Sequence, residues 1–199
     1  MKIIGITGGI GCGKSTVCEY LKNKYDAEII LADNVGHEVT EPGTDCNREL
    51  QKLFGANCFY SDGSLNRKII GDIAFRDPQI LQKMNSVIHP AVWDEIIKRF
   101  EAARAGGKRL AVLEAALLIE SKYVDICDEL WYVYADKDSR MKRLLSSRDI
   151  TEGKVNHIIK RQLSEDEFRK NCDFIIDNTK NFQKTAIEID SRLAERHLI

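Results

Sequence analysis

The chain has 199 residues, which is enough for one core domain with an insertion but hardly for two independent domains. Hydrophobic residues make up 43% of it and charged residues 31%, proportions typical of globular proteins rather than of disordered ones. The 30 Lys and Arg residues nearly balance the 31 Asp and Glu residues, so the composition gives no strongly basic surface of the kind that binds nucleic acids.

The six cysteines have no C-x-x-C spacing and no nearby pair of plausible zinc ligands. The apolar run at the start of the chain is too short for the hydrophobic part of a signal peptide, and no segment reaches the length of a membrane span. We therefore expect free thiols and a cytoplasmic protein that binds neither membranes nor nucleic acids.

Short β-branched runs alternate with longer helical patterns, which predicts an α/β fold with a five-stranded parallel sheet covered by helices on both faces. A helix near Lys14–Lys24 is expected directly after the first strand. In chain order, the expected strands are Lys2–Thr7, Glu28–Ala32, Arg109–Leu113, Leu130–Tyr134 and Phe174–Ile176.

One long interval, residues 35–106, has strong helix signals and no convincing strand. Asp77-Pro78 predicts a helix start, His89-Pro90 predicts the end of that helix and the start of another, and Gly106-Gly107 predicts the end of the second helix. We interpret the interval as a helical substrate-binding insertion, because ligands of open sheets bind beyond the carboxyl ends of the strands. A purely structural connection is the alternative. Residues 1–34 and 107–199 would then form the core.

A second unusual segment is strongly basic although the whole chain is balanced in charge. Two interpretations are open: a solvated helix face, or a lid over residues 138–165 that closes on a polyphosphate. Its cations are Lys137, Arg140, Lys142, Arg143, Arg148, Lys154, Lys160 and Arg161.

The strongest signal is a complete match to G-x-x-x-x-G-K-[ST] between the first strand and the first helix. Glycines let successive main-chain N–H groups point at phosphate oxygens, and the helix N-terminus adds its dipole. The lysine reaches the β- and γ-phosphates of ATP, and the serine hydroxyl completes the Mg²⁺ shell. The match predicts the three-layer sandwich of P-loop NTPases. Its residues are Gly8, Gly9, Ile10, Gly11, Cys12, Gly13, Lys14 and Ser15.

Two acids follow predicted strands. Asp33, after the second strand, could orient and deprotonate an attacking hydroxyl, or it could cap the helix that begins near Asn34. Glu114, after the third strand, could help to hold Mg²⁺ through water, face the substrate, or serve the fold alone. The residues by themselves do not decide between these roles.

Several segments stand together in a specific order and spacing: Ile4–Thr16, Leu31–Asp33, Phe54-Gly55, Asp62–Arg67 through Ala74-Phe75, Ile88–Pro90, Leu117–Glu120 and Asp173–Asn178. Through them the chain resembles the dephospho-CoA kinase family over nearly its whole length. Departures from the family pattern are Ala115-Ala116, where many members have a hydrophobic residue and proline, Glu114, where Asp is frequent, and Arg148, which falls one residue late.

The resemblance implies a nucleoside-monophosphate-kinase-like core that transfers phosphate from ATP to the 3′-hydroxyl of dephospho-CoA, the last step of coenzyme A synthesis. It implies that Asp33 is the catalytic base and Arg143 the lid arginine on the transferring phosphate. Further members of the implied site are Thr7 and the segment of Glu114 and Leu117 on the substrate side, and Thr16 and Asn178 on the nucleotide side.

The runner-up function is another small-molecule P-loop kinase, acting on a nucleoside monophosphate or a sugar. A nucleotide sensor without catalysis is a third possibility, and such a protein would need no base at Asp33.

Overall fold

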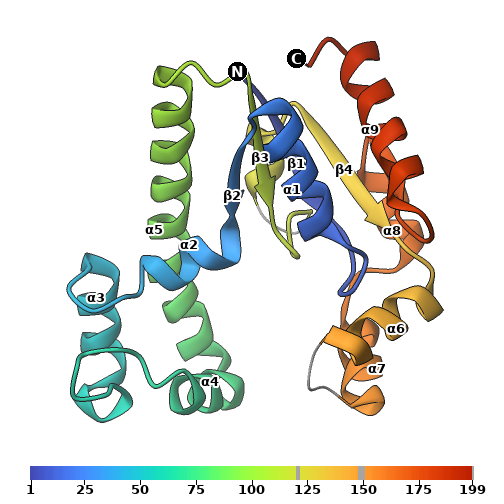
Figure 1. The fold of residues 1–199 in the computed structure, drawn as a ribbon. Helices are drawn as coiled ribbons and strands as arrows, with labels where there is room; N and C mark the ends of the chain where they lie inside the picture. Colours follow the sequence, from blue (N-terminus) through green and yellow to red (C-terminus); the bar gives the residue numbers. More distant parts are fainter. Residues whose placement is uncertain (120–121, 148–150, 199) are drawn as a thin grey trace. The chain divides into compact units, whose positions relative to one another are not determined.

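The computed structural model describes residues 1–119, 122–147 and 151–198. The chain divides into two compact units (Figure 1). The core unit consists of Met1–Ile30 and Ala103–Ile199, and the helical unit consists of Leu31–Ala102.

A five-stranded sheet has the strand order β2-β3-β1-β4-β5. Pairing is parallel between β1 and β3, between β1 and β4, and between β4 and β5. The α/β class and all five predicted strands are confirmed, with ends that differ by one residue at most. The strands are β1 (Lys2–Thr7), β2 (Glu28–Leu31), β3 (Leu110–Glu114), β4 (Glu129–Tyr134) and β5 (Phe174–Asp177).

Helices cover both faces of the sheet. Because side chains alternate along a strand, Trp131 and Tyr132 of β4 point to opposite faces. Trp131 belongs to the core cluster that includes Val17 of α1 (Lys14–Tyr25) and Ile189 of α9 (Phe182–Glu195). Tyr132 stacks on Phe168 of α8 (Glu165–Asn171), with ring centroids 4.7 Å apart. The strands are therefore apolar on both sides, which explains their continuous hydrophobic runs.

Two more helices follow β4 in the core unit: α6 (Lys137–Ser147) and α7 (Glu152–Arg161). The Asp136 carboxylate accepts hydrogen bonds from the main-chain N–H and the hydroxyl of Ser139, at 2.7 and 3.0 Å, which fixes the start of α6. A short 3₁₀ helix, η2 (Lys122–Ile126), precedes β4. In the ranges that the structure describes, no helix is long and apolar enough to cross a membrane.

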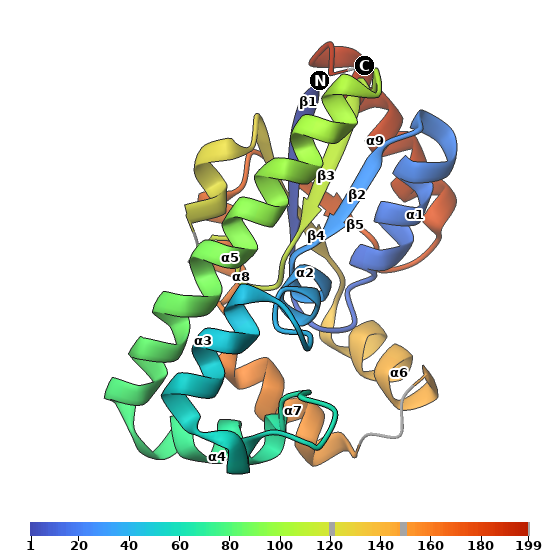
Figure 2. The same ribbon diagram turned by 90° about the vertical axis from the view of Figure 1, so that its left-hand side faces the viewer.

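In the helical unit the predicted helix start at Asp77-Pro78 is confirmed, and side chains also cap the starts of α3 (Asp45–Phe54) and α4 (Arg67–Arg76). Thr44 and Asn66 cap α3 and α4 by accepting main-chain N–H groups, and the Asp77 carboxylate accepts those of Gln79 and Ile80. Its elements, which Figure 2 displays after a turn of 90°, are α2 (Ala32–Glu38), α3 (Asp45–Phe54), η1 (Ala56–Cys58), α4 (Arg67–Arg76) and α5 (Pro78–Ala105).

The predicted helix break at His89-Pro90 is wrong. Helix α5 runs unbroken from Pro78 to Ala105 with Pro90 inside it. Pro90 is exposed, whereas Val92, Ile96 and Phe100 farther along the helix are buried at a spacing of four residues. The hydrogen bond that proline removes thus falls on the solvent side, where water can serve the orphaned carbonyl, and the buried stripe keeps the helix continuous.

Candidate active site

The loop from β1 to α1 has the backbone of a phosphate cradle. Gly8, Gly11 and Gly13 have positive φ angles of 146°, 79° and 95°, which side chains other than glycine rarely adopt. Gly13 is also the N-cap of α1 and has no side chain to cap it. The first N–H groups of α1 are therefore presented to an anion.

Three glycines of this loop allow other parts of the core unit to approach it closely. A Cβ on Gly9 would lie 2.3 Å from the Arg140 guanidinium, and one on Gly13 would lie 2.1 Å from Nδ2 of Asn178. A Cβ on Gly11 would lie 2.9 Å from Leu144 of α6. The glycines of the motif thus serve packing against α6 and the β5–α9 connection as well as backbone conformation.

Lys14, the motif lysine, is held by two oxygens. Its Nζ donates to the Gly8 carbonyl at 2.9 Å and lies 3.5 Å from Oε1 of Glu114, the last residue of β3. Only 14% of the Lys14 side chain and 17% of the Glu114 side chain are exposed. The structure therefore brings together two residues that the sequence assigned separately, a cation and a carboxylate beside the cradle.

Arg143, predicted to be the lid arginine, reaches the loop from α6. Its Nη1 donates to the carbonyls of Cys12 and Gly11 at 3.2 and 3.5 Å. Its Nη2 donates to the carbonyls of Asn178 and Thr179 at 2.6 and 3.3 Å. The guanidinium thus ties the phosphate loop to the connection that follows β5.

Asn178, predicted to lie near the adenine, is buried and packs against the loop. Its Nδ2 donates to the Cys12 carbonyl at 2.8 Å, and its main-chain N–H donates to the Tyr134 carbonyl at 2.8 Å. Thr185 of α9 donates its hydroxyl to the Asp177 carbonyl at 2.9 Å. Both the side chain and the main chain of Asn178 are therefore engaged in fixing the loop to β4, α6 and the connection after β5.

Cys12, inside the loop, is buried, as is Cys18 of α1. Burial raises the pKa of the Cys12 thiol above its ordinary value although Lys14 opposes the shift. Burial likewise raises the pKa of Cys18 to about 12. Both sulfurs are thus protonated packing groups at neutral pH. All six cysteines of the chain have free thiols.

Thr7, the last residue of β1, is fully buried directly before the loop. Within the ranges that the structure describes, its Oγ1 is the one buried side-chain polar atom without a hydrogen-bond partner. Such atoms are rare in folded proteins and call for an explanation. Thr7 lies directly before the loop, and its role in placing the substrate near the phosphates stays a prediction.

Asp33 is exposed in the first turn of α2, which begins at Ala32 directly after β2. The N-cap of α2 is Leu31, so the alternative that Asp33 caps this helix is wrong. Leu117, after β3, is 63% exposed. Glu120 and Arg148, from the family-like segment and the basic segment, lie outside the described residues.

Two further residues touch the loop, and the sequence did not single out either for this role. Arg140 of α6 donates from Nε to the Ile10 carbonyl at 2.8 Å, and the Oε1 of Gln162 accepts the Ile10 N–H at 3.0 Å. For Arg140 the basic segment was a signal. Gln162, which follows α7, carries no motif and reaches the loop across 152 positions of sequence.

A divalent cation would find oxygen donors here. Ser15, exposed in the first turn of α1, offers a hydroxyl, and Glu114 offers a carboxylate beside Lys14. Among the described residues there is no cluster of three or more His, Cys, Asp or Glu side chains that could hold a metal. A hydroxyl and a carboxylate are the kind of oxygen donor that Mg²⁺ takes from a protein, together with substrate phosphates.

Comparison with known proteins identifies the family. A family model described as dephospho-CoA kinase matches residues 2–184. A dephospho-CoA kinase from Dehalococcoides mccartyi is 36% identical over 191 residues, 95% of this chain and 96% of that protein. One from Geobacter sulfurreducens is 33% identical over 195 residues, 98% of this chain and 96% of that protein.

The fold is matched as well. A crystal structure from Thermus thermophilus superposes with a TM-score of 0.83 at 27% identity, covering 98% of this chain and 97% of the other. The family model and the relatives match almost the entire chain, including the phosphate loop. This chain therefore belongs to the dephospho-CoA kinase family.

Proposed function

We propose that this protein transfers the γ-phosphoryl group of ATP to the ribose 3′-hydroxyl of dephospho-CoA, giving coenzyme A and ADP. The observation that carries the proposal is the cradle itself: a glycine loop with positive φ angles, gripped by Arg140 and Arg143 and flanked by Lys14. Family membership supports the choice of acceptor, which the cradle alone does not make.

In this reaction the 3′-oxygen forms a bond to the γ-phosphorus, and the bond from that phosphorus to the bridging oxygen of ADP breaks. The hydroxyl proton passes to a base, a role we assign to Asp33. Its carboxylate is exposed, and Asp33 is not the N-cap residue of α2, which supports the assignment. Lys14 and Arg143 stabilise negative charge on the phosphates.

We assign Ser15 as the protein ligand of the metal ion. Glu114 would help either by binding the metal ion through a water molecule or by positioning Lys14. Mg²⁺ held there with the phosphates would neutralise charge and orient the γ-phosphoryl group. Ser15 contributes its hydroxyl, and Glu114 keeps Lys14 directed into the cradle, 3.5 Å away. Removal of divalent cations would then abolish turnover.

The remaining assignments follow the resemblance. The N–H groups of the loop and of Ser15 and Thr16 bind the phosphates of ATP, and the segment at Asn178 lies near the adenine. Thr7, Glu114 and Leu117 face the acceptor. An exposed Leu117 and an orphaned Thr7 hydroxyl support these roles, since each has a surface or a polar atom left to offer.

Residues 35–106 would bind the coenzyme A side of the acceptor, and residues 138–165 would act as the lid. The contacts of α6 with the loop support a lid role for the basic segment over a merely solvated face. Six free thiols and a place in coenzyme A synthesis support a cytoplasmic location.

The test is product analysis with MgATP and a panel of acceptors. Dephospho-CoA should yield ADP and a product with a new phosphate on the ribose 3′-oxygen. A 2′-deoxy analogue should remain a substrate and a 3′-deoxy analogue should not, because only the 3′-oxygen is placed for in-line attack.

Rapid phosphorylation of AMP, dTMP or a sugar with no turnover of dephospho-CoA would overturn the acceptor assignment. Tight ATP binding without transfer to any acceptor would instead identify a nucleotide sensor.

A further inference from the structure

The Ile10 peptide, in the middle of the phosphate loop, is held at both of its polar atoms. Its N–H donates to Oε1 of Gln162 at 3.0 Å, and its carbonyl accepts from Nε of Arg140 at 2.8 Å. Nη2 of Arg140 donates to the same Gln162 oxygen, also at 3.0 Å. These three residues, here called the Gln162 clasp, form a closed ring of hydrogen bonds.

The partners of the Gln162 oxygen are a donor set typical of a phosphate site. One is a main-chain N–H of a phosphate-binding loop, and the other is a guanidinium N–H of Arg140. Hydrogen bonds to an ionised acceptor are roughly twice as strong as those to a neutral one, and the amide of Gln162 is neutral. An anionic phosphoryl oxygen would therefore satisfy both donors better than Gln162 does.

The Arg140 donor is held in place independently of Gln162. Arg140 follows the capped start of α6, where Ser139 is bound by Asp136. Its guanidinium lies against Gly9, where a Cβ would be 2.3 Å away. Removing the side chain of residue 162 should thus leave the Arg140 donor pointing at the loop.

Gln162 is placed between two ordered ends. Its N–H donates to the Ile159 carbonyl at the end of α7, and a capping box of Ser164 and Glu167 begins α8 two residues later. A cavity of about 350 Å³ adjoins it, lined among others by Tyr132, Lys137 and Phe168. The side chain of Gln162 therefore has room to leave Ile10 without unfolding either helix.

We propose that the Ile10 N–H and the Arg140 guanidinium form a subsite for the terminal phosphate of a nucleoside triphosphate, and that the Gln162 amide oxygen competes with that phosphate for it. The proposal rests on the proposed kinase function and adds a residue that regulates nucleotide binding. When the terminal phosphate binds, its oxygen replaces the Gln162 amide oxygen as the hydrogen-bond acceptor. The connection between α7 and α8, which contains Gln162, is then no longer bonded to the loop. A diphosphate, which lacks the terminal group, leaves the clasp closed.

The test compares binding of ADP and of the β,γ-imido analogue of ATP by titration calorimetry. Gln162→Ala should bind the triphosphate analogue about 3- to 10-fold more tightly than the wild type, the worth of one hydrogen bond, and ADP unchanged. Gln162→Glu should bind the analogue about 10-fold more weakly, because a carboxylate strengthens the clasp and repels phosphate. Arg140→Ala should also weaken the analogue selectively.

Weaker or unchanged binding of the analogue by Gln162→Ala would overturn the proposal, as would equal changes for ADP. A damaged fold cannot imitate the expected gain in affinity, and thermal unfolding of each variant checks for it. Gln82→Ala, an exposed glutamine on α5, is the matched control and should bind like the wild type. If the wild type bound neither nucleotide, the kinase function itself would fail; if it bound both and the Gln162 variants did not discriminate, only the subsite would fail.

Discussion

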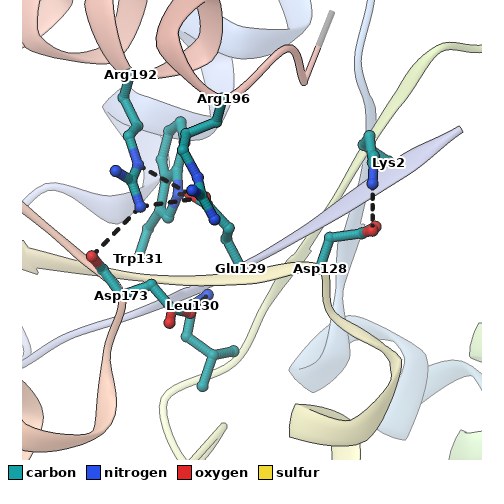
Figure 3. Close-up of polar contacts among 8 residues, drawn as sticks. All are labelled: Lys2, Asp128, Glu129, Leu130, Trp131, Asp173, Arg192 and Arg196. Carbon is teal, nitrogen blue, oxygen red and sulfur yellow. Dashed lines mark hydrogen bonds and ion pairs between the residues drawn. The ribbon is translucent and has the colours of Figure 1, made fainter.

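The two edges of the sheet in the core unit both hold largely buried charge, and they satisfy it in opposite ways. At the amino edge, Glu129 begins β4 with 3% of its surface exposed. Its carboxylate accepts hydrogen bonds from Arg192, Arg196 and the indole N–H of Trp131 at 2.7 to 3.1 Å. Figure 3 shows these side chains gathered around Glu129. Positive and negative groups here are paired with each other.

At the carboxyl edge the cationic side chains donate hydrogen bonds mostly to neutral oxygens. Arg143 donates to four main-chain carbonyls, Arg140 to the Ile10 carbonyl and the Gln162 amide, and Lys14 to the Gly8 carbonyl, with Glu114 at a longer 3.5 Å. These oxygens fix the positions of the three cations beside the phosphate loop. The contrast teaches that charge at the amino edge serves the fold, whereas charge at the carboxyl edge is arranged for an anion.

Loss of Lys14 is the largest expected effect on the carboxyl edge. Lys14→Ala should abolish turnover, because the charge that follows the β- and γ-phosphates is gone while the glycine backbone remains. A coupled assay of ADP release measures it, with Lys22→Ala, an exposed lysine of the same helix α1, as the control. Retention of most of the activity would mean that this loop is not the phosphate site.

Asp33→Asn should come next. It should lower kcat by roughly 10²–10⁴, the usual worth of a positioned general base, and leave ATP binding nearly unchanged. Steady-state kinetics with a separate measurement of ATP affinity distinguish the two effects. Equal losses of ATP affinity and rate would contradict the assignment and make Asp33 a metal ligand instead.

Arg143→Ala should lower kcat by about 10³, since an arginine on a transferring phosphoryl group is worth that much in related chemistry. The loss of ground-state ATP affinity should be smaller. Arg143→Lys keeps the charge but not the four carbonyl contacts, so it separates charge from loop positioning. A silent Arg143→Ala together with a damaging Arg140→Ala would move the catalytic role to Arg140.

Much of this core could be predicted from the sequence, because the signals are local. Apolar runs predicted the strands, and the glycine–lysine motif predicted the loop and the helix after it. The error at Pro90 arose because a proline rule takes no account of which helix face is buried. Only packing along Val92, Ile96 and Phe100 decides that question.

The contacts around the loop could not be predicted in the same way. Arg140 and Arg143 are three residues apart and share one helix face, so the sequence alone cannot say which loop atom each one reaches. Gln162 is an ordinary residue in the sequence, and only the fold brings it to Ile10. The predicted roles of Leu117 and of the lid boundaries remain predictions.

The smallest expected effect is on stability, and it tests the amino edge. Glu129→Gln should lower the free energy of unfolding by about 2 kcal/mol, because hydrogen bonds to a charged acceptor are lost and the exposure of Arg196 limits the cost. Turnover per folded molecule should remain that of the wild type. Glu195→Gln, at an exposed position of α9, is the control. Chemical denaturation measures the stability of both variants.

The same variant makes a prediction about pH. Burial by itself would raise the pKa of Glu129, but hydrogen bonds from Trp131, Arg196 and Arg192 hold it below the ordinary carboxyl value. A carboxyl whose pKa is lower in the folded state stabilises the fold above its unfolded pKa of about 4.3, and this contribution is lost as the pH falls through the folded pKa. The stability gap between the wild type and Glu129→Gln should therefore be full at pH 7 and shrink between about pH 4 and pH 2. If the difference in unfolding free energy stayed constant over that range, the charge of Glu129 would contribute nothing to stability through the contacts drawn in Figure 3. The claim that charge at the amino edge stabilises the fold would then be wrong.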